Sequence, residues 1–413
     1  MDTLPLETLA IRKNALLIAV NKRWWHEAYI DKLRRFYATA NGFYVDSVQG
    51  GYTDIIPAIN RLIGAKEVDV VFIDANGLWN VNLFFIQAIK CSKKVLVITD
   101  IYKHDSDLIT ASACDVCEIG CPINVLKYQE KGHWAVFSSI ISDERIFRQH
   151  HLPKDIDVLY FGSQRNDRKS YLDYIRDAGV SLTIVEQGDE AYTSDLALAR
   201  LISRSKIVVN FSKLSFTSVK PKYYFFLRVR KGRPFKSEFQ LKGRIFLSAL
   251  CGTAFVTEHA PAHRLVYPDH ELYQFRTKEE CVNIIEHLLD NPDELKSYTE
   301  TMHAVTQELY SDKNSFMQVV KAIEESGSTE QKLNYIPYGY IRRCVNEVVC
   351  RNFSVRNIFE AKIILTMVRD NNILVKLVVL LEFLAQFLGS FLKQVIKKFL
   401  RIFLPALADR LGG

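Results

Sequence analysis

The 413-residue sequence has few of the residues that interrupt regular structure: 18 Gly and 11 Pro. This scarcity excludes collagen-like and low-complexity chains. Walker A, HExxH, GxSxG and protein-kinase motifs are also missing, so nothing points to the enzymes that these motifs mark. With 48% hydrophobic and 24% charged residues, the composition is that of a globular protein with enough chain for two cored domains.

The N-terminus also lacks a recognisable leader. Residues 1–7 contain no basic cluster and no long apolar run, so the sequence predicts no secretory signal. The eight cysteines lie mostly within apolar segments, and we expect reduced thiols in the cytoplasm. The close spacing of Cys114, Cys117 and Cys121 leaves a metal site and buried small hydrophobic residues as two interpretations. No fourth ligand has matching spacing, His133 being the nearest, and we expect no metal.

Short apolar runs alternate with helix-period segments in the first third of the chain. Strands are expected at the runs Ala15–Val20, Val68–Ile73, Val95–Thr99 and Trp134–Phe137. Unbroken runs of this kind are typical of parallel strands that are buried on both faces by helices. The sequence therefore predicts an α/β, Rossmann-like domain over residues 1–150.

The same pattern starts again near residue 155. Strands are expected at Val158–Phe161, Leu182–Val185, Ile207–Asn210 and Ala254–Thr257, with helices between them and closing helices up to about Glu325. This predicts a second doubly wound domain over residues 151–330. Such sheets bind ligands beyond the carboxyl ends of their strands, and two of them facing each other make a cleft.

A basic insert at residues 213–241 interrupts the second domain. Between Lys213 and Arg244 there are ten Lys or Arg residues and one acid, Glu238. Such a charge imbalance indicates an anionic partner, although a solvated charged loop is the alternative. Its centre, residues 223–234, is predicted to be a hairpin. Aromatic residues in the insert also occur in nucleic-acid binders, but no RNA- or DNA-binding module accompanies them, and we expect no nucleic acid.

The last segment, residues 331–413, is predicted to be a helical tail. Residues 373–404 are rich in Leu, Val, Ile and Phe, yet the longest uncharged run, Phe383–Leu392, is shorter than the roughly 20 residues needed to cross a bilayer. Lys393, Lys397 and Lys398 fall on one helical face and large apolar residues on the other. This pattern is typical of a helix lying in a membrane surface, and packing on the protein or on a second copy is the alternative.

The first candidate binding motif is the turn after Val158–Phe161. Gly162 lets the backbone approach a ligand closely, and the start of the following helix offers unpaired N–H groups to a phosphate. Arg165 adds a charge suited to a diphosphate. A simple turn with solvated arginines is the alternative.

The second motif is residues 241–258, LKGRIFLSALCGTAFVTE. This stretch resembles the nucleotide-binding half of GT-B glycosyltransferases, most closely the group 1-like, spore-maturation type. The resemblance extends over about residues 12–325, including Asp157–Arg165, Ser205–Ser212 and Tyr310–Asp312. It excludes the insert and the tail.

The resemblance implies a glycosyltransferase of two Rossmann-like domains, the first for the acceptor and the second for an NDP-sugar donor. The cofactor-binding residues that it implies in the donor half are Gly162, Arg165, Asn210, Lys242, Gly243, Arg244 and Glu258. In the retaining members of the family, a Glu usually stands where this sequence has Leu247 and holds the nucleotide ribose. Glu258 could take over that contact, and the substitution also leaves room for an inactive relative.

Stabilising a leaving diphosphate is electrostatic work, for which we expect Arg165, Lys242 and Arg244. An inverting enzyme also needs a general base. Strand-end residues supply the candidates, which are His26, Asp74, Asp100, His104 and Asp105. We expect Asp100 or His26 to be catalytic, with turn or cap roles as the alternative for each.

The sequence thus predicts a cytoplasmic, peripherally membrane-associated glycosyltransferase that modifies a cell-surface glycan or glycolipid. It needs an NDP-sugar as donor substrate and no obligatory cofactor. A catalytically inactive scaffold that recruits a partner at the membrane is the first alternative. An epimerase acting on an NDP-sugar is the second.

Overall fold

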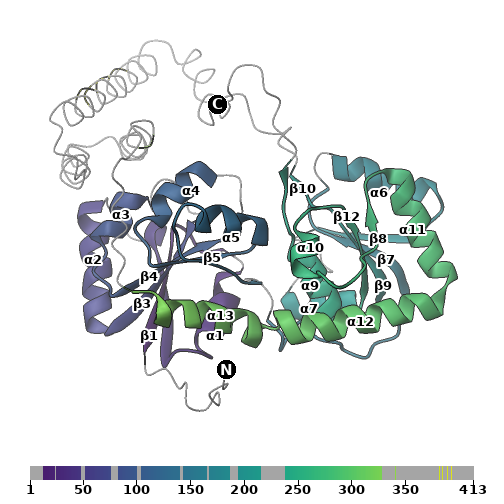
Figure 1. The fold of residues 1–413 in the computed structure, drawn as a ribbon, viewed down its shortest axis with the longest axis horizontal. Coiled ribbons are helices and arrows are strands. Elements are labelled where there is room, and N and C mark those ends of the chain that lie inside the picture. The colour runs from purple at the N-terminus through teal and green to yellow at the C-terminus, as the bar shows by residue number, and fades with distance from the viewer. Residues whose placement is uncertain are drawn as a thin grey trace, which may run out of the picture. The chain divides into compact units, whose positions relative to one another are not determined.

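The computed structural model describes residues 13–23, 25–47, 52–75, 82–99, 104–139, 143–164, 167–186, 194–214 and 238–327, together with residues 340, 381, 384, 388 and 392. Two sheets flanked by helices dominate the fold (Figure 1).

The first sheet has six strands in the order β2-β1-β3-β4-β5-β6. Its strands are β1 (Asn14–Ala19), β2 (Thr39–Tyr44), β3 (Val68–Asp74), β4 (Lys93–Ile98), β5 (Val116–Ile119) and β6 (Ala135–Phe137). Strand β1 runs parallel to both β2 and β3, and β3 runs parallel to β4. The register places Leu16 beside Val71 of β3.

The helices connecting these strands are α1 (His26–Leu33), α2 (Tyr52–Ala65), α3 (Leu83–Ala88), α4 (His104–Ala111) and α5 (Pro122–Gln129), with a 3-10 turn at Val45–Ser47. Five of the six residues of β1 are fully buried. An unbroken apolar strand is stable only where helices cover both faces of its sheet, which is the arrangement predicted for this region.

The second sheet is parallel throughout, in the order β13-β12-β9-β7-β8. Its strands are β7 (Ile156–Phe161), β8 (Leu182–Val185), β9 (Ser205–Asn210), β12 (Ala254–Glu258) and β13 (Gln274–Phe275). Its helices are α6 (Asp167–Asp177), α7 (Asp195–Ser203), α9 (Arg244–Leu250), α10 (His263–Val266), α11 (Lys278–Asp290), α12 (Pro292–Tyr310) and α13 (Asp312–Glu325).

The two faces of the second sheet belong to two separate hydrophobic clusters. Val158 and Val209 contribute to a cluster that includes residues of α11 and α12. Their chain neighbours Leu159 and Val208 contribute to a cluster with Leu198 of α7. This alternation follows from the two-residue period of a strand, and it confirms that the sheet is buried on both sides.

The chain divides into two compact units. The first comprises residues 1–98, 103–117 and 326–413, and the second comprises residues 99–102 and 118–325. Tyr340 belongs to the first unit, where its hydroxyl accepts a hydrogen bond from the backbone N–H of Leu83 (2.8 Å) and lies 2.9 Å from Oγ1 of Thr110. The chain beyond α13 therefore returns to the unit in which it began.

The centre of the basic insert, including the predicted hairpin at residues 223–234, lies outside the described residues. Its two ends form a short antiparallel pair, β10 (Lys213–Leu214) and β11 (Glu238–Phe239), in which Lys213 is opposite Phe239. The insert thus leaves and re-enters the domain through adjacent strands.

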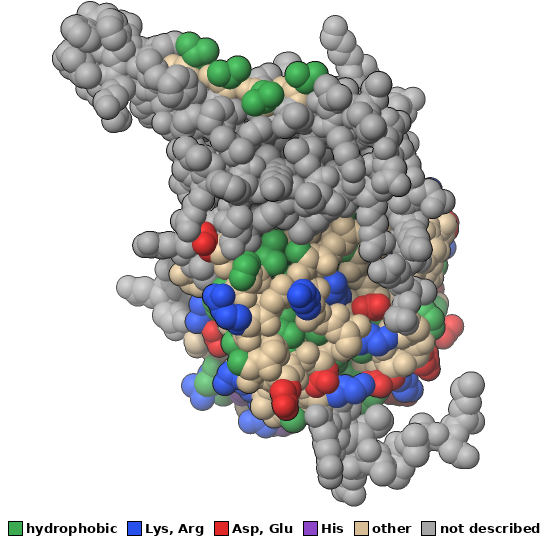
Figure 2. Space-filling model, turned by 90° about the vertical axis from the view of Figure 1, so that its left-hand side faces the viewer, with side chains coloured by type: hydrophobic (Ala, Val, Ile, Leu, Met, Phe, Trp, Pro, Cys, Tyr) green, Lys and Arg blue, Asp and Glu red, His purple; other side chains and the backbone are tan. Residues whose placement is uncertain are grey.

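Besides Tyr340, the described residues of the tail are four leucines: Leu381, Leu384, Leu388 and Leu392. Each is helical and exposes between 44% and 57% of its surface. Apolar side chains of the tail appear in green at the top of Figure 2, whereas lower on that face basic, acidic and apolar side chains are interspersed. Among the described residues, no helix has both the length and the apolar character needed to span a membrane.

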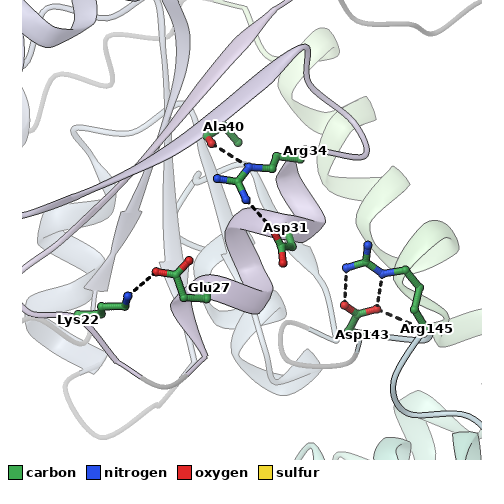
Figure 3. Close-up of polar contacts among 7 residues, drawn as sticks. All are labelled: Lys22, Glu27, Asp31, Arg34, Ala40, Asp143 and Arg145. Carbon is green, nitrogen blue, oxygen red and sulfur yellow. Dashed lines mark hydrogen bonds and ion pairs between the residues drawn. The ribbon is translucent and has the colours of Figure 1, made fainter. Parts of the chain in front are cut away.

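Ion pairs connect side chains around α1 and in the segment that follows β6 (Figure 3). Lys22 pairs with Glu27 at 2.7 Å, and Arg34 bonds both Asp31 (2.6 Å) and the carbonyl of Ala40 (3.2 Å). The Arg34 contacts tie α1 to β2. In the second unit, Arg145 forms a two-point pair with the buried Asp143, at 2.9 and 2.6 Å. Bidentate pairs of this kind fix side-chain geometry better than single contacts do.

Candidate functional site

The strand order of the second sheet defines where a ligand is expected. Strand β8 lies on one side of β7 and β9 lies on the other, so the chain direction across the sheet reverses between β7 and β9. In open α/β sheets, ligands bind beyond the carboxyl ends of the strands at such a switch point. Gly162 directly follows β7, and Asn210 ends β9. Both predicted binding residues therefore lie at the switch point.

Gly162 and Arg244, which the sequence analysis selected from separate motifs, are in direct contact. Gly162 has φ of +125°, and a Cβ atom added there would lie 2.2 Å from Nη2 of Arg244. The Arg244 Nε donates a hydrogen bond to the carbonyl of Phe161 (2.6 Å). Its guanidinium carbon also lies 5.4 Å from the ring centroid of Tyr160. The missing side chain at Gly162 thus makes the room that the guanidinium occupies.

Lys242 and Gly243 precede this arginine at the start of α9. Gly243 is exposed, and a Cβ atom there would meet nothing within 4 Å. The Lys242 Nζ donates to Oε1 of Gln240 (2.7 Å), and Gln240 Nε2 donates to the carbonyl of Thr99 (2.8 Å). Gln240 is buried and was not selected from the sequence, because an amide between two apolar residues gives no motif signal.

Asn210 and Glu258 end the neighbouring strands β9 and β12, and both are buried. The Asn210 amide donates to Thr257 Oγ1 (2.8 Å), within the protein. The Glu258 carboxylate accepts the backbone N–H groups of Ser212 (3.0 Å) and Lys213 (2.8 Å). Burial raises the pKa of Glu258, and these two hydrogen bonds oppose that shift.

The predicted base His26 lies at the corresponding switch point of the first sheet, between β1 and β3. Its Nδ1 accepts the backbone N–H of Arg23 (3.0 Å), so the proton belongs on Nε2, which donates to Oδ2 of Asp74 (3.1 Å). His26 is fully buried, with Trp25 against one side and Tyr44 stacked on it. Both ring nitrogens are thus engaged inside the protein, and a catalytic role for His26 stays a prediction.

Other predicted residues cannot be placed in this way. Asp100 and Arg165 lie outside the described residues, as do the side chains of His104 and Asp105. Their predicted roles therefore remain predictions.

The three clustered cysteines are buried, as one of the two interpretations predicted. Cys114, Cys117 and Cys121 expose at most 9% of their surface. Burial raises the pKa of the Cys114 and Cys117 thiols, which disfavours the thiolate that binds metals. In the described part of the chain, no three His, Cys, Asp or Glu side chains are grouped so as to hold a metal ion.

Comparison with known proteins gives a family match over part of the second unit and a fold for most of the chain. Residues 145–321 match the model of a family described as glycosyl transferase-like. No protein among the curated sequences matches the chain. Two of the proteins with similar solved structures are matched over nearly their whole length. HepE of Anabaena, in complex with UDP and glucose, has 11% identity and a TM-score of 0.53, with 76% of this chain and 99% of HepE covered.

The second is sucrose-phosphate synthase of Thermosynechococcus elongatus, with 10% identity and a TM-score of 0.52. The match again covers 76% of this chain and 99% of the other. A further HepE structure, in complex with UDP-glucose, has a TM-score of 0.54 at 11% identity over 75% of this chain and 99% of HepE. These similarities show that the chain has the GT-B fold, as predicted.

Proposed function

We propose that the chain is a glycosyltransferase of the group 1-like type, which transfers a sugar from a UDP-sugar to a cell-surface glycan or glycolipid; its GT-B fold and the family match over residues 145–321 support this function. The observation that carries the donor half of this proposal is the contact between Gly162 and Arg244 at the switch point of the second sheet. UDP is the proposed nucleotide because the structures of HepE contain UDP and UDP-glucose.

Sugar transfer from a UDP-sugar requires positive charge beside the diphosphate, because negative charge develops there as the sugar is transferred. Arg244 is held by the Phe161 carbonyl and by the ring of Tyr160, so its charge is oriented before a donor arrives. A preoriented charge stabilises a developing anion without the cost of reorganisation. We assign Arg244 to the donor diphosphate, together with Arg165 and Lys242. Asp100 is the proposed base, since both ring nitrogens of His26 already bond within the protein.

Thermal unfolding in the presence of UDP, GDP, CDP, ADP or dTDP tests the donor class. A ligand that binds only the folded state raises its stability by about 2.7 kcal/mol at a hundredfold excess over the dissociation constant. We expect a rise in melting temperature with UDP, and its loss in Arg244→Ala. Well-folded protein that responds to none of the five nucleotides would refute a sugar-nucleotide transferase.

The alternative is a scaffold that has lost catalysis, and one observation favours it. Leu247 occupies the position of the family Glu and is buried in a hydrophobic cluster with Phe161, Leu198 and Cys251. A buried leucine cannot accept a hydrogen bond from a ribose hydroxyl. The nucleotide panel separates the two functions, because a scaffold of this kind binds nucleotides weakly or not at all.

We also propose that the tail holds the protein at the cytoplasmic face of a membrane. The support is the row of exposed leucines at positions 381, 384, 388 and 392, which recur at helical spacing. Lys393 and Lys397 follow in the sequence, and apolar residues combined with cations are typical of helices that bind anionic lipid surfaces.

Cosedimentation with vesicles of phosphatidylglycerol and phosphatidylcholine tests this association. The variant Leu384→Glu/Leu388→Glu should reduce the bound fraction severalfold, because a charged side chain opposes burial of the apolar face. Leu196→Glu is the matched control, since Leu196 is an equally exposed leucine on α7 (42%). Equal binding by the tail variant and the wild type would disprove the proposed contact.

A further inference from the structure

Glu258 does not lie at the position in the fold where the family glutamate is expected. It ends β12, the strand that follows α9, whereas Leu247 lies within α9. The sequence analysis transferred the ribose contact from the Leu247 position to Glu258. In the structure, the Glu258 carboxylate binds the backbone instead: its Oε2 accepts hydrogen bonds from two successive backbone N–H groups.

Those two groups belong to Ser212 and Lys213, where the chain enters the insert through β10. Glu258 is 8% exposed, and hydrogen bonds to a buried carboxylate are stronger than those between neutral groups. A carboxylate spanning two adjacent N–H groups fixes the direction of the backbone between them. Glu258 therefore determines how the chain leaves the end of β9.

The carbonyl and the hydroxyl of Ser212 also have partners. Its carbonyl accepts the backbone N–H of Gln240, which follows β11 on the returning leg of the insert (2.8 Å). Its hydroxyl lies 3.4 Å from Nε2 of His263 and 3.3 Å from the Asn210 amide. The fully buried residues of this network leave the base of the insert little freedom to move.

This fixed backbone places the Lys213 side chain beside the β7–α6 connection. The Lys213 Nζ lies 3.4 Å from Oδ2 of Asp167, the first residue of α6, and both side chains are partly exposed. An exposed pair of this kind contributes at most about 1 kcal/mol. The ammonium can therefore exchange the Asp167 carboxylate for an anion of higher charge. Arg168, in the same turn, acts electrostatically on Glu258, so positive charge gathers at this edge.

We propose that Lys213 binds the diphosphate of the donor and that Glu258 is a positioning residue, which sets Lys213 through its backbone and does not contact the ribose. This inference rests on the proposed use of a nucleotide sugar. The sequence indicated an anionic partner only for the basic insert as a whole; the proposal assigns the contact to Lys213 and gives the base of the insert a function in the donor site.

Affinities of the full-length protein for UDP and 2′-deoxy-UDP, measured by calorimetry, test the proposal. Lys213→Ala and Glu258→Ala should each weaken UDP binding about tenfold, the usual effect of losing one hydrogen bond to a charged group. The double variant should be no weaker than the single variants, because Glu258 acts through Lys213. Glu258→Gln keeps an oxygen that accepts the two N–H groups and should bind UDP nearly as the wild type does.

The ratio of the two affinities separates positioning from ribose contact. It should stay at the wild-type value in Glu258→Ala, and collapse of the ratio would overturn the proposal in favour of a ribose ligand. Lys206→Ala, at the opposite end of β9, is the control and should bind UDP normally. Unchanged UDP binding by Lys213→Ala would overturn this inference alone. Wild-type protein that binds no nucleotide would overturn the proposed function as well.

Discussion

Gly162 shows how one missing side chain can shape a site. Its φ of +125° is in a region that side chains disfavour, and the space of its absent Cβ is filled by the Arg244 guanidinium. We predict that Gly162→Ala destabilises the fold by about 2 kcal/mol, the cost of a strained backbone residue, and also weakens UDP binding by displacing Arg244. Urea unfolding and UDP calorimetry measure the two effects.

Gly179→Ala is the matched control for this substitution. Gly179 also has a positive φ, +87°, but a Cβ atom there would meet nothing within 4 Å. It should lose about 1 kcal/mol of stability for conformational reasons and keep its nucleotide affinity. If both alanine variants bind UDP equally well, the contact between Gly162 and Arg244 has no role in the site.

Local sequence signals were enough to select some residues of the candidate site and could not select others. Gly162 and Arg244 belong to recognisable motifs, but their contact could not be predicted from either motif. The hydrogen bond from Arg244 to Phe161, the neighbour of Gly162, joins residues that are 83 positions apart in the sequence. His263 carries no such signal, since its contact with Ser212 joins segments that meet only in the folded domain. His26 was selected as a candidate general base, and its hydrogen bonds to Arg23 and Asp74 could not be read from spacing.

At the scale of elements, burial determined what could be predicted. The central strands β1, β3, β7 and β9 follow the predicted apolar runs because helices cover both their faces. The edge strand β2 was missed, since its sequence TANGFY is polar and contains a glycine. Pairing with β1 and the close fit of Gly42 against Ile30 stabilise it, and neither feature leaves a periodic signal.

The returning segment after α13 depends on one buried hydroxyl. Tyr340 is 4% exposed, and its oxygen serves both Leu83 and Thr110. We predict that Tyr340→Phe lowers the free energy of unfolding by about 1 kcal/mol, because the N–H of Leu83 loses its partner while the ring keeps its packing. Tyr174→Phe, at an exposed tyrosine of α6, should leave stability unchanged in the same urea titration. Equal stability of the two variants would show that Tyr340 contributes only apolar packing.

For the whole molecule, the buried His263 makes stability depend on pH. Burial lowers the pKa of His263 from 6.5 to about 4. Between these two pH values His263 binds a proton in the unfolded chain but stays neutral in the folded chain. Protons therefore favour unfolding, and stability falls as the pH decreases from 6.5 to about 4. The loss from this group reaches about 3 kcal/mol at 1.36 kcal/mol per pKa unit.

The measurement is the difference between wild type and His263→Gln in urea unfolding at pH 7 and at pH 4.5. The glutamine variant should lose less stability on acidification, because it has no proton to bind. A parallel loss in both proteins would assign the acid sensitivity to other groups.

The first unit is assembled from both ends of the chain, and this has a consequence for synthesis. The ribosome makes residues 118–325, nearly the whole second unit, before it makes Ser326, whose hydroxyl accepts a hydrogen bond from Lys93 (3.0 Å). Tyr340 emerges later still. The residues of the second unit are therefore complete while the chain is still growing, whereas Leu83, Lys93 and Thr110 of the first unit gain their contacts with Tyr340 and Ser326 only afterwards. A chain stopped after α13 would contain every strand of both sheets and still leave the earlier-made unit unfinished.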